Sequence, residues 1–238
     1  AQLSLDDYAR ALPYFEKAAE TDPNYAEAWY QAGYCYGILG RHTDALRASR
    51  QAAKLRPEWA ATFVNIGASS YALGQYKEAV DAYKQAIRLD EDSADIQYSL
   101  GLTFNKMART DEEILSYKRA ILLKPDHANA IEKLGLALFK QRKFTDSAAA
   151  FDQLKTYKPD AKTYNNLGES YFEGGKTEES IEAFNNALGA NADFDKARFN
   201  LGRAYVKLGN RDMAQVQYEI LRNSKSDWAD RLFVVLNP

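Results

Sequence analysis

The stretch AEAWYQAGYCYGILGRHTDALRASRQAAKLRPEW, residues 26–59, is one copy of a unit that recurs along the chain. Its eighth residue is a glycine, and glycines at this position follow one another at steps of 34, 34, 34, 33 and 34 residues. They are Gly33, Gly67, Gly101, Gly135, Gly168 and Gly202. A fixed period of this length is typical of an array of one repeated structural unit.

Within each unit, apolar and small residues recur at helical spacing. Positions 4, 7, 8 and 11 share one face of a first helix because they lie three and four residues apart. Glycine at position 15, as in Gly40 and Gly74, predicts a left-handed residue that ends this helix. The small–aromatic–small pattern at positions 20, 24 and 27, as in Ala79, Tyr83 and Ala86, predicts a second helix. We expect the large residue at position 24 to pack over the glycine at position 8.

This pattern resembles the tetratricopeptide repeat family. The signature positions of one unit hold Trp29, Ala32, Gly33, Tyr36, Ala45, Ala52 and Pro57, and those of another hold Gly168, Tyr171, Phe184 and Ala187. Glu113 departs from the pattern, because a small residue is usual at its position. The resemblance implies an all-α fold: a right-handed α-solenoid, or superhelix, of stacked helix-turn-helix units that bury one continuous core between neighbours.

We predict a single solenoid over residues 1–238. It starts with a half repeat at 1–25 and ends with a terminal helix at 227–238. The full repeats between them are 26–59, 60–93, 94–127, 128–160, 161–194 and 195–226. Ser4 and Asp7 are spaced to cap the first helix, and Pro13 within it predicts a lost hydrogen bond and a kink.

The terminal helix carries the apolar run Leu232–Leu236, so we expect part of its surface to remain apolar and exposed. Two interpretations stay open. Either further parts of a longer protein cover both ends of the array, or the ends associate with one another.

Composition and residue pattern argue against several classes of function. A net charge of -2 gives no electrostatic reason to expect nucleic-acid binding, and no apolar run is long enough to span a membrane. We predict no catalytic residues, cofactor or metal site. His42 and His127 are expected in solvated loops, Cys35 in a small packing slot, and the acidic cluster Asp90, Glu91, Asp92 and Asp95 lacks the pattern of a calcium loop. The compartment stays undetermined.

The resemblance places a partner on a concave surface lined by positions 2, 5, 6, 9, 12 and 13 of the first helices. Position 6 is rich in amides, which offer both a donor and an acceptor to a peptide backbone. The row resembles the asparagine ladder of O-linked N-acetylglucosamine transferase. Basic residues gather in the last two units, which favours a partner with an acidic end there. The predicted partner-binding residues are Tyr30, Gln31, Tyr34, Asn65, Tyr98, Ser99, Lys133, Asn166, Lys196, Phe199, Asn200 and Arg203.

The sequence therefore predicts a protein–protein interaction scaffold, not an enzyme, that binds a peptide or protein segment in this groove. An alternative is the substrate-recruiting arm of a larger enzyme such as a glycosyltransferase. Self-assembly through the ends of the array is a third possibility.

Overall fold

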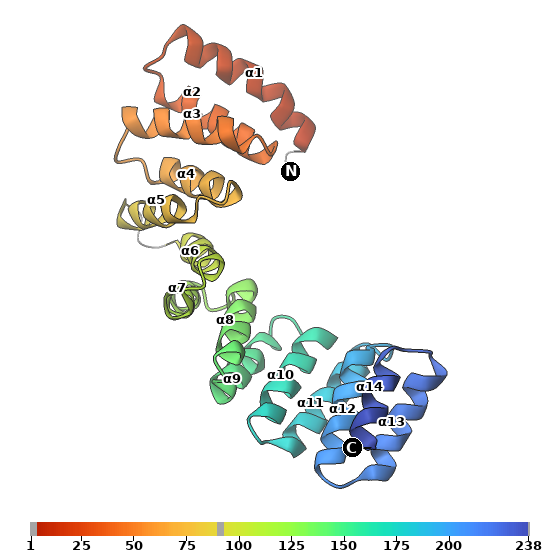
Figure 1. The fold of residues 1–238 in the computed structure, drawn as a ribbon. Coiled ribbons are helices and arrows are strands. Elements are labelled where there is room, and N and C mark those ends of the chain that lie inside the picture. Colours follow the sequence, from red (N-terminus) through yellow and green to blue (C-terminus); the bar gives the residue numbers. More distant parts are fainter. Residues whose placement is uncertain (1–3, 90–92, 238) are drawn as a thin grey trace. The chain divides into compact units, whose positions relative to one another are not determined.

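The computed structural model describes residues 4–89 and 93–237, and this part of the chain consists of α-helices and connecting turns, with no strand (Figure 1). The helices fall into two compact units, the first extending to Pro125 and the second beginning at Asp126. The first unit holds α1 (Leu5–Thr21), α2 (Ala26–Ile38), α3 (His42–Leu55), α4 (Ala60–Ala72), α5 (Tyr76–Leu89), α6 (Ala94–Lys106) and α7 (Thr110–Leu123). The second holds α8 (Ala128–Lys140), α9 (Phe144–Leu154), α10 (Ala161–Glu173), α11 (Thr177–Ala190), α12 (Asp195–Lys207), α13 (Arg211–Asn223) and α14 (Trp228–Leu236).

The helices follow the sequence period. The first helix of each full repeat begins at Ala26, Ala60, Ala94, Ala128, Ala161 or Asp195, the residues at which the sequence analysis starts each unit. Each first helix packs against the second helix of its own repeat and against the second helix of the repeat before it within a compact unit. The predicted all-α array of helix pairs is confirmed.

Local signals set the helix ends. The Ser4 hydroxyl accepts from the backbone amide of Asp7, and the Asp7 carboxylate accepts from the backbone amide of Ser4 at 2.8 Å, so the predicted cap is present. The helix that it starts continues through Pro13. Gly40 and Gly74 have the positive φ expected of them, and Ala108 and Arg142 adopt the same left-handed backbone at the corresponding turns without being glycine.

Two expectations for the histidines are wrong. His127 is 8% exposed and caps α8, because its Nδ1 accepts from the backbone amide of Ala130 at 3.2 Å. His42 is half-buried and is the first residue of α3, since the turn after Gly40 is too short to leave it in a loop. Of the acidic cluster, Asp95 lies exposed in the first turn of α6, whereas residues 90–92 lie outside the described residues.

Close helix contact explains the recurring glycine at position 8. A Cβ atom on Gly101 would lie 2.5 Å from Cε1 of Tyr117, whose side chain is fully buried at position 24. The last repeat differs: the three atoms nearest to a Cβ on Gly202 would all belong to Leu232 of α14, the first at 2.6 Å. The nearest neighbour is here not the position-24 residue, because α14 packs against both α12 and α13 and its Leu232 occupies the gap.

Glu113 shows how an unusual residue is accommodated. Its side chain is buried and accepts a hydrogen bond from Asn105 Nδ2 at 2.9 Å, so a polar contact takes the place of the usual small residue. Cys35 is buried among apolar side chains, as its packing position predicts, and burial raises the pKa of its thiol. None of the described helices is both long and apolar enough to cross a membrane, and residues 4–89 and 93–237 contain no group of three metal-ligating side chains.

Candidate functional site

The first helices of the first unit lie next to one another and form a common face, with α2 against α4 and α4 against α6. A pocket of about 180 Å³ opens on this face between α2 and α4. We call it the groove pocket. Its walls are Gly33, Tyr34, Gly37, Ile38, His42, Asn65, Ala68 and Ser69.

Asn65 lines the groove pocket, and its side chain carries an unused hydrogen-bond donor. Its Nδ2 atom is enclosed and makes no hydrogen bond within the described residues. An enclosed donor without an acceptor costs about 1–3 kcal/mol, so an acceptor that enters the pocket gains more from this amide than from a solvated one. Beside it, the side chains of Tyr34 and Ile38 remain 38% and 40% exposed and give the pocket an apolar rim.

Several predicted groove aromatics pack within the array. The Tyr30 ring stacks against Trp59 with a centroid separation of 4.4 Å, and Phe199 lies 5.0 Å from Trp228. Tyr98 lies 5.9 Å from Tyr117. Tyr30, Tyr98 and Phe199 are all half-buried. Burial is also the main cause of the raised pKa of Tyr30. These rings pack between neighbouring elements of the array, so most of their surface is buried there and is not available to a partner.

The remaining first-unit candidates, Gln31 and Ser99, are half-buried on α2 and α6, and Lys133 of the second unit is half-buried on α8. Of the six candidates in the first unit, Tyr34 and Asn65 line one pocket. Ile38 and His42, which sequence reasoning missed, line it with them. Ile38 occupies position 13 of its repeat, so the family pattern of groove positions contained the signal for it.

In the second unit, the asparagines hold neighbouring repeats together. Asn200 is 2% exposed, and its Nδ2 donates to Asn165 Oδ1 at 3.0 Å. Asn165 in turn donates to Glu169 Oε2 at 2.9 Å, and Lys196 donates to the same oxygen at 2.9 Å. Asn166 is also buried. The expectation that position 6 is free surface is therefore wrong at Asn166 and Asn200, since both are buried and the Asn200 amide is bonded to Asn165 of the preceding repeat.

The basic residues of this unit are also engaged. Arg203 contacts Glu173 at 3.4 Å and lies over the ring of Phe172 at 4.6 Å. Lys162 pairs with Glu132 at 2.5 Å, and Lys207 donates to the Phe172 carbonyl at 3.2 Å. This neutralisation removes most of the attraction that the sequence offered to an acidic partner. Lys196, Asn200 and Arg203 thus come together as a structural network.

This arrangement defines a class of protein: stacked helix pairs that present a face of first helices with a small, partly apolar pocket. Family models identify the repeat. The model described as TPR repeat matches residues 67–107 and 168–209, and two models described as tetratricopeptide repeat match residues 114–165 and 94–127. The model of anaphase-promoting complex, cyclosome, subunit 3 matches residues 4–86. The chain belongs to the tetratricopeptide repeat family.

Solved structures share the fold at low sequence identity. YrrB, a TPR protein with an unusual peptide-binding site, is 22% identical, with a TM-score of 0.68 over 77% of this chain and 95% of that chain. MamA is 24% identical, with a TM-score of 0.66 over 70% and 92%. The Cut9–Hcn1 hetero-tetramer of the APC/C is 17% identical, with a TM-score of 0.58 over 98% of this chain and 46% of that chain. These similarities show the fold, and with the repeats they support a protein-interaction scaffold.

Proposed function

We propose that this chain binds an extended peptide segment on the face formed by α2, α4 and α6, by equilibrium binding without catalysis. The observation that carries the proposal is the enclosed Asn65 amide, which lacks an acceptor within the described residues and lines the groove pocket. A backbone carbonyl of the peptide accepts from Asn65 Nδ2. A neighbouring side chain of the peptide enters between Tyr34 and Ile38.

In this mode of binding, the Asn65 amide supplies affinity and the groove pocket supplies selectivity. The amide recognises a backbone group that every peptide has, so it contributes affinity independent of sequence. The pocket of about 180 Å³ has an apolar rim, so it favours a peptide side chain of moderate size and low polarity. Gln31, Tyr98 and Ser99 would extend the contact along α2 and α6. That YrrB is described as having a peptide-binding site agrees with the proposal at the level of the fold.

The test is a displayed peptide library screened against the full chain and against Asn65→Asp. The aspartate keeps the shape of the side chain but replaces the donor with an acceptor, so selected peptides should lose most of their affinity. Asn166→Ala is the matched control, since it changes the same repeat position in the second unit and should leave the binding unchanged. Peptides that bind wild type and Asn65→Asp equally, or no selected peptide at all, would contradict the proposal.

Self-association is a second candidate function, favoured by one surface. Positions 19, 22 and 26 of the second helices are mostly polar, as in Glu179 and Glu182 of α11, but in α13 they are Met213, Val216 and Ile220. All three are at least 40% exposed. On α14, Phe233 and Val234 are 50% and 67% exposed, so the predicted apolar surface of the terminal helix is present.

We test this candidate by the molar mass in solution. Light scattering should show a mass that rises with concentration for wild type and stays monomeric for Val216→Glu. A wild type that remains monomeric at millimolar concentration would exclude it. The enzyme-arm interpretation, which relied on Asn65, Asn166 and Asn200, has less support, because the hydrogen bond to Asn165 takes up the amide of Asn200.

A further inference from the structure

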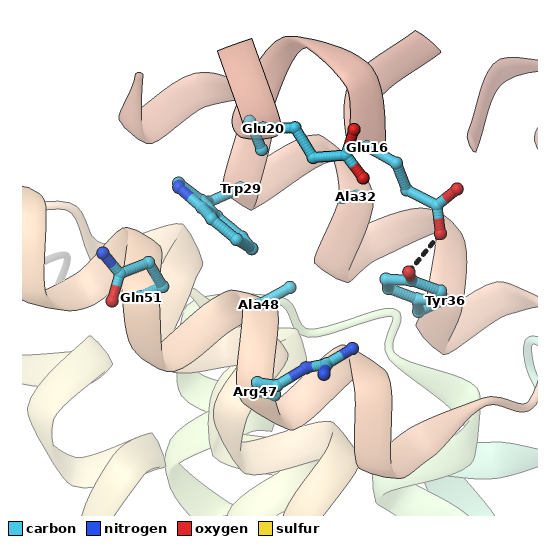
Figure 2. A pocket seen from close by; sticks show the side chains of 9 residues that line it. Glu16, Glu20, Trp29, Ala32, Tyr36, Arg47, Ala48 and Gln51 are labelled. Carbon is cyan, nitrogen blue, oxygen red and sulfur yellow. Dashed lines mark hydrogen bonds between the residues drawn. The ribbon is translucent and has the colours of Figure 1, made fainter. Parts of the chain in front are cut away.

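A second, larger pocket lies on another side of the first unit, between α1, α2 and α3 (Figure 2). We call it the α1–α3 pocket. Its volume is about 630 Å³. Small buried side chains leave this space, since Ala19, Ala32 and Ala48 face it from the three helices. It shares no residue with the groove pocket.

Trp29 forms one wall of the α1–α3 pocket, and its ring is held in place. The indole Nε1 donates to the carbonyl oxygen of Pro23 at 3.0 Å. Within residues 4–89 and 93–237, no cationic side chain lies over this ring. The other two tryptophans differ, because the guanidinium carbon of Arg56 lies 5.0 Å from the ring centroid of Trp59 and that of Arg231 lies 4.5 Å from the ring centroid of Trp228.

Arg56 is an example, within this chain, of an arginine that lies on a tryptophan ring. Its guanidinium lies over Trp59 and also pairs with the Glu27 carboxylate at 2.5 Å. An aromatic face and a carboxylate together therefore hold one arginine. Cation–π attraction and a charge-assisted hydrogen bond both favour this geometry, and a planar guanidinium suits both partners better than an ammonium does.

The α1–α3 pocket offers the same two elements. Glu16 and Glu20 of α1 stand at its upper edge in Figure 2, where Glu20 is the one nearer to Trp29 and Glu16 lies above Tyr36. The Tyr36 hydroxyl donates to Glu16, drawn as the dashed line in Figure 2, and this bond fixes the carboxylate at the pocket. Burial, followed by the bond to Glu16, raises the pKa of Tyr36 to about 12, so the hydroxyl remains a donor at neutral pH.

The charges of α1 at this pocket are only partly compensated. The guanidinium of Arg41, 4.4 Å from the Tyr36 ring centroid, attracts Glu16 but forms no ion pair with it in the described part of the chain. Glu20 has only Lys17 at 4.0 Å, with both side chains more than 70% exposed. Such an exposed pair contributes little. Arg47 lies at the opposite edge, where its guanidinium bonds Asp44 at 3.0 Å and not the tryptophan. The edge formed by α1 is therefore the acidic one.

We propose that the α1–α3 pocket binds an arginine side chain of a partner protein. The guanidinium lies on the Trp29 ring and donates to Glu20, as Arg56 lies on Trp59 and pairs with Glu27, and Glu16 adds negative charge to the same edge. The aliphatic part of the arginine packs on Ala19, Ala32 and Ala48. This site is independent of the groove pocket, so the two can engage different segments of a partner.

The indole N–H signals of the three tryptophans provide the assay. The full chain, labelled with ¹⁵N, is titrated with N-acetyl-arginine N-methylamide and with its neutral citrulline counterpart. We expect a saturable shift of the Trp29 signal with the arginine compound only, and much smaller shifts of Trp59 and Trp228, whose rings already carry an arginine. Trp29→Phe assigns the signal.

Charge removal tests the carboxylates. The double variant Glu16→Gln with Glu20→Gln should bind the arginine compound roughly fivefold more weakly, the loss expected for about 1 kcal/mol of ionic attraction. Glutamine still accepts from Tyr36, so the fold should be retained, which circular dichroism checks. Glu58→Gln, an exposed change outside the pocket, is the matched control and should leave the affinity unchanged. Equal shifts with citrulline, an unmoved Trp29 signal, or unchanged affinity of the double variant would each overturn the proposal.

Discussion

The contact between Gly202 and Leu232 gives a quantitative test of how α14 completes the last repeat. Leu232 is fully buried, and a Cβ on Gly202 would lie 2.6 Å from its Cδ2. Leu232→Ala removes this packing and leaves a cavity, so it should reduce the free energy of unfolding by about 3 kcal/mol. Val234→Ala on the same helix is the control, because this side chain is 67% exposed and should change the free energy by less than about 0.5 kcal/mol.

The reciprocal change at Gly202 sharpens the test. Gly202→Ala gains about 1 kcal/mol of helix propensity but forces Leu232 to move, which costs about 2 kcal/mol, so the net loss should be about 1 kcal/mol. In the double variant the new methyl group enters the cavity left by Leu232→Ala. The free energy of unfolding of the double variant should fall by about 2 kcal/mol. The losses of the two single variants add up to about 4 kcal/mol, so the coupling energy should be about 2 kcal/mol.

Urea unfolding followed by circular dichroism measures the four free energies, and hydrogen exchange of the α14 amides locates the effect. Protection in α14 should fall in Leu232→Ala and recover partly in the double variant. Additive losses, or a Val234→Ala variant as unstable as Leu232→Ala, would refute the assignment of Leu232 to the gap over Gly202.

Three further predictions concern a turn, a hydrogen bond and a cap. Ala108 has a φ of 56°, so Ala108→Gly should stabilise the chain by about 1 kcal/mol and raise the midpoint of thermal unfolding. Asn200→Ala should cost about 1–3 kcal/mol in urea unfolding, because it leaves the buried Asn165 carbonyl without its donor, and a loss below about 0.5 kcal/mol would show that the bond is unimportant. The backbone amide and then the hydroxyl of Ser4 hold the pKa of Asp7 below its usual range, so the cap stabilises α1 above the unfolded pKa of about 3.9 and is lost as the pH falls through the lowered folded value. Amide exchange in the first turn of α1 should report this loss, and Asp7→Asn should remove its pH dependence.

The repeat period predicted the fold because each helix start depends on local residues. Spacing alone placed the first helices at Ala26, Ala60, Ala94, Ala128, Ala161 and Asp195. It did not predict the role of Leu232, because that side chain comes from outside the repeat and reaches Gly202 through the packing of α14. A helix that departs from the period has no register from which its contacts could be read.

The candidate site was harder to predict, because the same residue at the same position has different neighbours. Asn200 finds its partner at position 5 of the preceding repeat, which is Asn165. The corresponding residue before Asn65 is Tyr30, whose ring stacks on Trp59. Asparagines at the same repeat position therefore have different roles in the structure: Asn200 forms a hydrogen bond between repeats, whereas Asn65 holds an unused donor.

The unused donor has a consequence for how stability and binding are related in this chain. The second unit shows that an asparagine at position 5 satisfies one at position 6 of the next repeat, so the bond was within reach of a single substitution at Tyr30. The chain instead keeps an enclosed Asn65 Nδ2 without an acceptor, at a cost of about 1–3 kcal/mol. A peptide carbonyl that accepts from Asn65 recovers this free energy on binding, whereas the same carbonyl at Asn200 would have to displace an existing bond. Ligand binding should therefore raise the stability of α2 and α4 more than that of α10 and α12, and amide exchange of the bound and free chain measures the difference.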